Sequence, residues 1–134
     1  IVFSALNNLL KMELPVVKND NVGTFLNHAE IVNDTAAQIM KDFGMFGVEI
    51  NFSGNVEKAY DELHSQLTDQ VQHLLNVNYD KLLSVLYQVD ITEREIQQAE
   101  TDLPHYNQIE IIAHQIIARE LKKVLWRRYF KMKK

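Results

Sequence analysis

Apolar side chains recur along this chain at intervals of three and four residues, which is the spacing of a helix with one buried face. The segments that show this spacing are 20–43, 56–75, 79–89 and 108–130. The first forms either one kinked helix or two short ones, because Gly23 and the polar residues 33–35 could each begin a new helix. Gly44 is the expected helix stop. All the strong signals therefore predict helices.

Residues that favour helix starts support these boundaries. Three predicted helices are preceded by an asparagine that can accept a hydrogen bond from the first turn, namely Asn55, Asn78 and Asn107. Thr92 and Glu95 fit a capping box, in which each side chain accepts a hydrogen bond from the other residue's backbone, and they open a further helix over 93–101. Pro104 ends that helix, and Glu110 lies three residues after Asn107 to help open the last one.

One segment departs from the helical spacing. Val48, Ile50 and Phe52 alternate with polar residues, as in a half-buried strand. A strand needs a partner, either the segment 14–18 or the edge of a second copy, and an extended connection is the alternative. We therefore expect an all-α protein, an antiparallel bundle of four to six helices with a short extended or β segment near 45–53.

The composition suits one soluble domain, because 134 residues with 46% hydrophobic residues can bury a core. We expect a single helical domain over 1–134, with 1–18 loosely attached and a basic tail at 131–134. The absence of cysteine excludes disulfides, thiolate metal sites and thiol nucleophiles, and it favours the cytoplasm. No basic residue precedes the apolar run at 1–10, so we expect no export signal.

The sequence lacks the motifs of common catalytic sites. Its four scattered glycines form no nucleotide-binding loop and no nucleophile elbow. Asp42, Phe43 and Gly44 spell the magnesium-binding tripeptide of protein kinases, but a kinase needs further motifs and a longer chain, so we interpret this match as chance. We predict no catalytic residue and no cofactor.

Histidines and carboxylates at helical spacing are the candidate metal ligands. Asp61 with His64, and Glu110 with His114, could each supply half of a site. With the apolar residues of 56–75 turned inward, however, Asp61 points outward and His64 lies on the flank. His114 lies at the border of the last helix's apolar face. A metal-dependent enzyme is therefore the least favoured hypothesis, and we predict no bound metal.

Glu120 lies near the centre of the apolar stripe of the last helix. A carboxylate in that position needs partners. We expect a structural ion pair with Arg94 or Arg127, or a stripe that leaves the core here and faces another subunit. General acid–base catalysis is a weaker interpretation, because the sequence identifies no second ionisable group beside it.

Basic residues gather at the C-terminal end. Residues 119–134 carry a net charge of +7, whereas residues 1–118 carry −11. Cations mixed with aromatic rings are typical of surfaces that bind nucleic acid or anionic lipid. The candidate contact residues are Lys123, Trp126, Arg127, Arg128 and Lys131. Interaction with the helix dipole and plain solvation are the alternative explanation, and the acidic remainder of the chain would repel phosphate.

Two patterns in the second half of the chain resemble a group of bacterial proteins. Residues 79–91 follow the pattern YxKLLxxLYxxDI, and residues 112–119 follow IAxxIIxR. On these patterns the chain resembles short helical proteins of Bacteroidetes-type bacteria that have no established activity. The resemblance implies a bacterial, soluble and mainly helical protein, and it implies no functional residue.

These observations favour a non-catalytic protein–protein interaction module that self-associates, as a homodimer, or binds another protein. The apolar face of the last helix is broader than one neighbouring helix can cover, which indicates a partner surface. The alternative function is binding of nucleic acid or an anionic membrane through the basic aromatic end of that helix. No small-molecule substrate is indicated.

Overall fold

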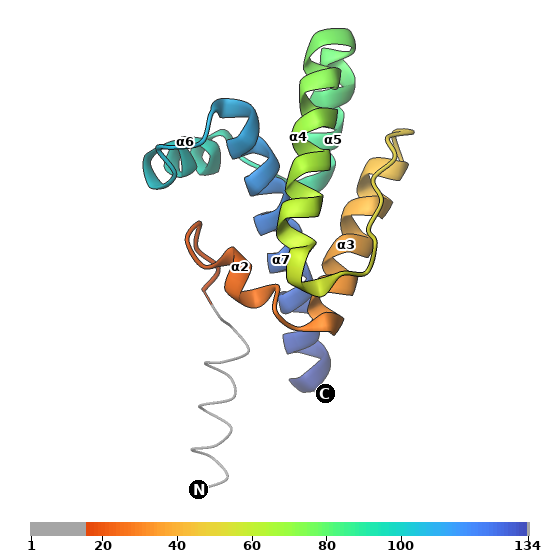
Figure 1. Ribbon diagram of the computed structural model, residues 1–134, viewed down its shortest axis with the longest axis vertical. Helices are drawn as coiled ribbons and strands as arrows, with labels where there is room; N and C mark the ends of the chain where they lie inside the picture. The colour runs from red at the N-terminus through yellow and green to blue at the C-terminus, as the bar shows by residue number, and fades with distance from the viewer. Residues whose placement is uncertain (1–15, 134) are drawn as a thin grey trace, which may run out of the picture.

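The computed structural model describes residues 16–133, which form six α-helices and one 3₁₀ turn and contain no strand (Figure 1). The elements are α2 (Val22–Phe25), α3 (Ala29–Gly44), η1 (Val56–Lys58), α4 (Ala59–Val77), α5 (Tyr79–Val89), α6 (Glu93–Asp102) and α7 (Gln108–Lys133). The predicted all-α class is confirmed. Of the segment 1–18, only 16–18 lie within the described residues, and the start of the expected basic tail belongs to α7.

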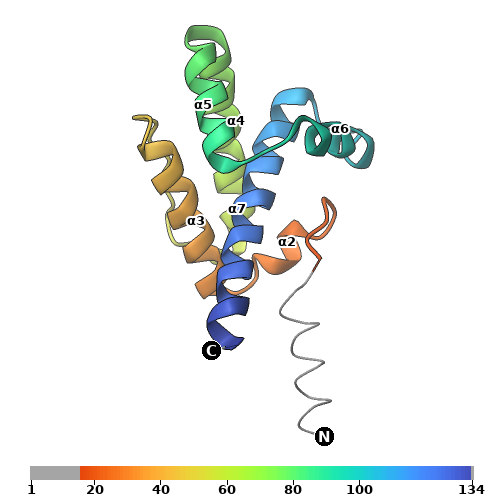
Figure 2. The ribbon, with the colours of Figure 1, turned by 180° about the vertical axis from the view of Figure 1, so that it is seen from behind.

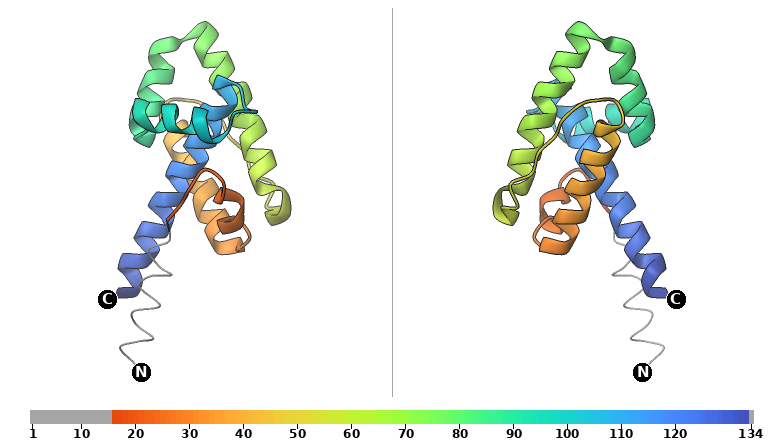
Figure 3. Two further views of the ribbon diagram at one scale, coloured as in Figure 1. Left: turned by 90° about the vertical axis from the view of Figure 1, so that its left-hand side faces the viewer. Right: turned by 90° about the vertical axis from the view of Figure 1, so that its right-hand side faces the viewer.

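Helix α7 is the centre of the fold and packs against each of the other five described helices. Helices α3 and α4 lie along it and run antiparallel to it, while α5 folds back along α4 (Figures 1 and 2). Helix α6 crosses the N-terminal part of α7 from the side, as Figure 3 shows. The central position explains the broad apolar face of α7. The other helices of the same chain cover that face. Its buried residues are therefore not available to a partner.

The segment 20–43 forms two helices, and the break lies at residues 26–28 instead of at Gly23 or 33–35. Val22 and Leu26 are both buried, so the short α2 contributes one turn to the core. His28 then adopts an extended backbone and α3 begins. Thr35 is fully buried inside α3, so tertiary packing carries the helix through polar residues that favour a break in isolation.

The segment around Val48 and Ile50 is an extended connection, which confirms one of the two alternatives for it. Both side chains are buried, as the alternation predicts. Its hydrogen-bond partners come from α4: Gln66 accepts from the backbone N–H of Asn51 at 2.9 Å and donates to its carbonyl at 2.5 Å. A helix side chain thus supplies the hydrogen bonds that a partner strand would otherwise provide.

The helix-start signals are confirmed by their hydrogen bonds. The side chains of Asn55 and Asn78 accept from the backbone N–H of Glu57 and Lys81, each at 3.1 Å. Thr92 and Glu95 form the complete capping box of α6. At the start of α7, the backbone N–H of Glu110 donates to the Asn107 side chain, and the N–H of Asn107 donates to Glu110 Oε1, both at 2.9 Å.

Candidate functional site

Three elements bring two tyrosines and two histidines together beside α7. Tyr60 and His64 come from α4, Tyr106 from the loop before α7, and His114 from α7 itself. The hydroxyl oxygen of Tyr60 lies 3.1 Å from that of Tyr106 and 2.5 Å from Nδ1 of His114. The His64 ring stacks on both tyrosine rings, with centroid distances of 5.3 and 5.2 Å. We call these four residues the Tyr–His cluster.

Burial favours the neutral forms of His114 and Tyr60. His114 is only 4% exposed, and burial, assisted by the nearby His64, lowers its pKa to about 4, although the backbone of Asn19 acts in the opposite direction. Burial also raises the pKa of the Tyr60 phenol. Among the described residues, no group accepts from or donates to Nε2 of His114 with hydrogen-bond geometry. The prediction that His114 lies at a border is therefore wrong, because the neighbouring helices enclose it.

A cavity of about 430 Å³ adjoins the cluster between α2, α4 and α7. Buried apolar side chains of Val22, Leu26 and Leu103 form part of its wall. Its acidic lining residues are all exposed, namely Asp20, Glu57 and Asp61. None of its described lining residues is a lysine or an arginine. The cavity therefore combines an apolar wall, an acidic surround and one buried histidine.

The candidate metal ligands do not face one common point, and most of them bond other groups of the protein. Asp61 is exposed, as predicted. His64 bonds through Nε2 to the backbone carbonyl of Glu110 at 2.9 Å, while the Glu110 carboxylate caps α7. Nδ1 of His114 is held by Tyr60. Across residues 16–133, no three His, Cys, Asp or Glu side chains are placed to hold one metal ion.

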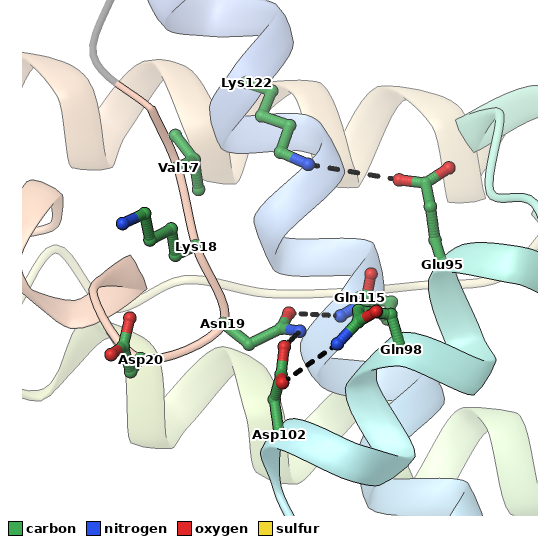
Figure 4. A pocket seen from close by; sticks show the side chains of 9 residues that line it. All are labelled: Val17, Lys18, Asn19, Asp20, Glu95, Gln98, Asp102, Gln115 and Lys122. Atoms are coloured by element: carbon green, nitrogen blue, oxygen red, sulfur yellow. Dashed lines mark hydrogen bonds and ion pairs between the residues drawn. The ribbon is translucent and has the colours of Figure 1, made fainter.

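A second cavity, of about 450 Å³, lies between the segment 17–20, α6 and α7 (Figure 4). Its polar side chains mostly bond one another. Asn19 donates to Asp102 at 2.8 Å, and Gln115 donates to Asn19 at 2.6 Å. Gln98 also donates to Asp102, at 3.1 Å. This network joins the N-terminal segment to two helices, so its polar groups serve the fold.

Glu120 is fully buried between α7 and α3, where it faces Asp42 and Lys123. The Lys123 ammonium lies 2.7 Å from Glu120 Oε1 and 3.4 Å from Asp42 Oδ2. Burial, together with the neighbouring Asp42, raises the pKa of Glu120 to about 8. Burial alone would raise the pKa of Asp42 too, but hydrogen bonding with Glu120 and the charge of Lys123 lower it. We call these three residues the acid–lysine cluster.

The sequence predicted Arg94 or Arg127 as the partner of Glu120, and both predictions are wrong. Arg94 is exposed on α6, and Arg127 donates to Gln38 at 2.7 Å. Lys123 occurs one helical turn after Glu120 and reaches it within the same helix. Asp42 belongs to the kinase-like tripeptide noted in the sequence. It is buried in the core, where it pairs with Lys123.

The basic end of α7 faces acidic residues of α3. Arg128 lies 2.6 Å from Asp34 and 3.3 Å from Glu30, and Lys123 belongs to the acid–lysine cluster. Trp126 is 51% exposed and packs on Tyr129 and Phe130. Lys131 is exposed. Of the predicted contact residues, Lys123, Arg127 and Arg128 thus hold α7 to α3 within the chain.

Helix α5 carries the clearest exposed apolar surface that sequence reasoning did not single out. Tyr79, Leu83 and Tyr87 are 55%, 46% and 88% exposed and follow one another at four-residue steps. A shallow groove beside Leu83 and Tyr87 extends to Phe46, after the end of α3, and the described residues that line it are all uncharged. We call Tyr79, Leu83 and Tyr87 the α5 stripe.

Comparison of the chain with protein-family models, curated proteins and solved structures finds no match. None of the helices over residues 16–133 combines the length and the apolar composition needed to cross a membrane.

Proposed function

We propose that the protein is a non-catalytic interaction module that self-associates through the α5 stripe, in a bacterial cytoplasm. The observation that carries this proposal is the row of three large, exposed apolar or aromatic side chains on one helix. Exposed apolar rows of this kind are typical of interaction surfaces, and tyrosine is enriched in protein interfaces. The row lies on the second helix of the α4–α5 hairpin (Figure 1).

The order of residues in the stripe suits a second copy of the same chain. Leu83 lies midway between Tyr79 and Tyr87. A two-fold axis at Leu83 would therefore pair the two leucines and place each Tyr79 against the partner's Tyr87. The neighbouring Ser84 and Gln88 are uncharged, so this antiparallel pairing of helices brings no like charges together there.

Binding of nucleic acid or anionic lipid through the end of α7 has less support. Arg128 pairs with two acids of α3 and Arg127 donates to Gln38, and the ion pairs reduce the field available to a phosphate. Trp126 is the only tryptophan, so its fluorescence during titration with an oligonucleotide or with anionic vesicles tests this alternative directly.

Sedimentation velocity over a range of protein concentrations tests self-association. We expect a monomer–dimer equilibrium for the natural sequence and a monomer for Leu83→Glu, because the substitution places two like charges on the two-fold axis. Gln97→Glu adds the same charge to an exposed position of α6 and is the matched control, which should leave the equilibrium unchanged. A monomer at every concentration, or a dimer that Leu83→Glu leaves intact, would overturn the proposal.

A further inference from the structure

The cavity beside His114 is a separate candidate site, because its lining shares no residue with the α5 stripe. Its volume of about 430 Å³ falls within the range of small-molecule sites. Such sites pair a mainly apolar wall with a few polar groups that orient the ligand. The wall of Val22, Leu26 and Leu103 and the ring of Tyr106 provide the first part, and His114 provides the second.

The unsatisfied nitrogen of His114 is the strongest sign of a ligand. Nδ1 is occupied by Tyr60, but Nε2 is buried and has no hydrogen-bond partner of suitable geometry among residues 16–133. Buried polar groups in folded proteins are nearly always bonded, and an unpaired one reduces stability. His114 and Asn19, whose backbone interacts with it, both line this cavity. A small shift of the Asn19 segment would let a ligand in the cavity bond the unpaired nitrogen.

The Tyr–His cluster can adapt to a hydroxyl group. If Tyr60 donates to Nδ1 of His114, Nε2 carries the proton and acts as a donor. If Tyr60 instead donates to Tyr106, Nδ1 donates to Tyr60 and Nε2 becomes an acceptor. A hydroxyl group both donates and accepts, so it satisfies Nε2 in either arrangement.

The charges around the cavity select a cation. Asp20, Glu57 and Asp61 line it and are exposed, and within residues 16–133 no lysine or arginine lines it. A cation between these carboxylates keeps part of its hydration, whereas the same charge beside the buried Nε2 would lose its water without gaining a counter-ion. The charged group of a ligand therefore belongs at the acidic surround.

We propose that this cavity binds a small amphipathic amine, with its ammonium group among Asp20, Glu57 and Asp61 and a hydroxyl group on Nε2 of His114. The apolar body between the two groups lies against Val22, Leu26 and Leu103. An aromatic body gains additional contact with the face of Tyr106.

Four small molecules with the same ring separate the contributions of charge and hydroxyl group. Tyramine has both groups, 2-phenylethylamine lacks the hydroxyl, tyrosol lacks the charge, and 4-hydroxyphenylacetate carries the opposite charge. In calorimetric titrations of the full chain, we expect tyramine to bind about fivefold more tightly than 2-phenylethylamine, the effect of one neutral hydrogen bond. Tyrosol should bind more weakly than tyramine, and 4-hydroxyphenylacetate should bind most weakly of all. Added salt should reduce the advantage of tyramine over tyrosol.

Variants test the two ends of the site. Asp61→Asn should weaken the binding of tyramine about threefold, because one partly screened ion pair is lost. The affinity for tyrosol should stay unchanged. Asp69→Asn removes an exposed carboxylate from the same helix outside the cavity and is the matched control. In nitrogen-15 NMR spectra, the Nε2 signal of His114 should shift with tyramine and tyrosol and stay nearly unchanged with 2-phenylethylamine.

Several results would overturn the inference. Absence of saturable tyramine binding, equal affinity for all four molecules, or an unmoved His114 signal would each do so. Measuring the titrations also on Leu83→Glu keeps this test independent of self-association.

Discussion

Two polar clusters interrupt the apolar surface of α7, and they accommodate burial in different ways. In the Tyr–His cluster, Tyr60 shares hydrogen bonds with Tyr106 and His114, and Nε2 of His114 has no hydrogen-bond partner among residues 16–133. The acid–lysine cluster holds charge, and its lysine lies within ion-pair distance of both carboxyl groups. A buried charge requires a counter-ion, which Lys123 provides in the acid–lysine cluster.

The two clusters also respond to protons in opposite directions. Burial disfavours the charged form in both, which lowers the pKa of His114 and raises the pKa of Glu120. His114 is thereby kept as a neutral hydrogen-bonding group next to the cavity. Glu120 is kept near protonation, where it can donate to Asp42 while Lys123 balances the remaining charge.

The largest expected effect comes from removing the counter-ion. Lys123→Met leaves the carboxyl groups of Asp42 and Glu120 without a cation, and we expect a loss of about 3 kcal/mol in the free energy of unfolding, measured with urea. Lys122→Met is the control, since Lys122 lies 3.9 Å from Glu95 at the surface and should contribute less than about 1 kcal/mol. Adding Asp42→Asn and Glu120→Gln should restore much of the loss. A failure of this rescue would mean that Lys123 acts through packing.

A smaller loss of stability is expected in the Tyr–His cluster. Tyr60→Phe keeps the ring but removes the hydroxyl that bonds Tyr106 and His114, so we expect a loss of about 2 kcal/mol in the urea unfolding free energy. Tyr87→Phe, at a position 88% exposed, should change the free energy of unfolding by no more than a few tenths of a kcal/mol. If the two substitutions have equal effects in monomeric protein, the Tyr60 hydrogen bonds contribute nothing measurable.

The smallest effects are in the pH dependence of stability, where the clusters should differ in sign. Glu120 binds its proton more tightly in the folded state, so its contribution is complete below pH 4.5 and falls as the pH rises to about 8. His114 binds its proton less tightly when folded, so its contribution is complete above pH 6.5 and falls as the pH drops to about 4.

Unfolding measured across pH 4–9 for the natural sequence, Glu120→Gln and His114→Asn isolates these contributions. Relative to Glu120→Gln, the natural sequence should lose stability as the pH rises from 4.5 to 8, because folding raises the pKa of Glu120. Relative to His114→Asn, it should lose stability as the pH falls from 6.5 to 4. Curves of the same sign for both variants would contradict the contrast between the clusters.

Local signals in the sequence were enough for most of the fold. Helix periodicity and capping act between residues a few positions apart, which is why the boundaries of α5, α6 and the start of α7 could be predicted from Asn78, Thr92 and Asn107. The break between α2 and α3 was misplaced, because burial of Leu26 and Thr35 overrides the local preferences.

The candidate sites were predicted less completely, because they depend on residues far apart in the sequence. His114 was singled out, but Tyr60 and Tyr106 were missed as its partners, since their separations of 54 and 8 residues from it carry no periodic signal. The positions of Tyr79, Leu83 and Tyr87 fit a helix face, but the sequence does not reveal which face the neighbours leave uncovered.

By itself, the sequence determined the helical class, the start of most helices and the burial of Val48 and Ile50, because each follows from interactions within a few residues. Only the tertiary structure decided that α7 lies at the centre, that Glu120 pairs with Lys123 near Asp42, and that His114 borders a cavity. Packing brings together groups from distant parts of the chain, and their burial then determines which of them stay neutral, which stay charged and which face a ligand or a partner.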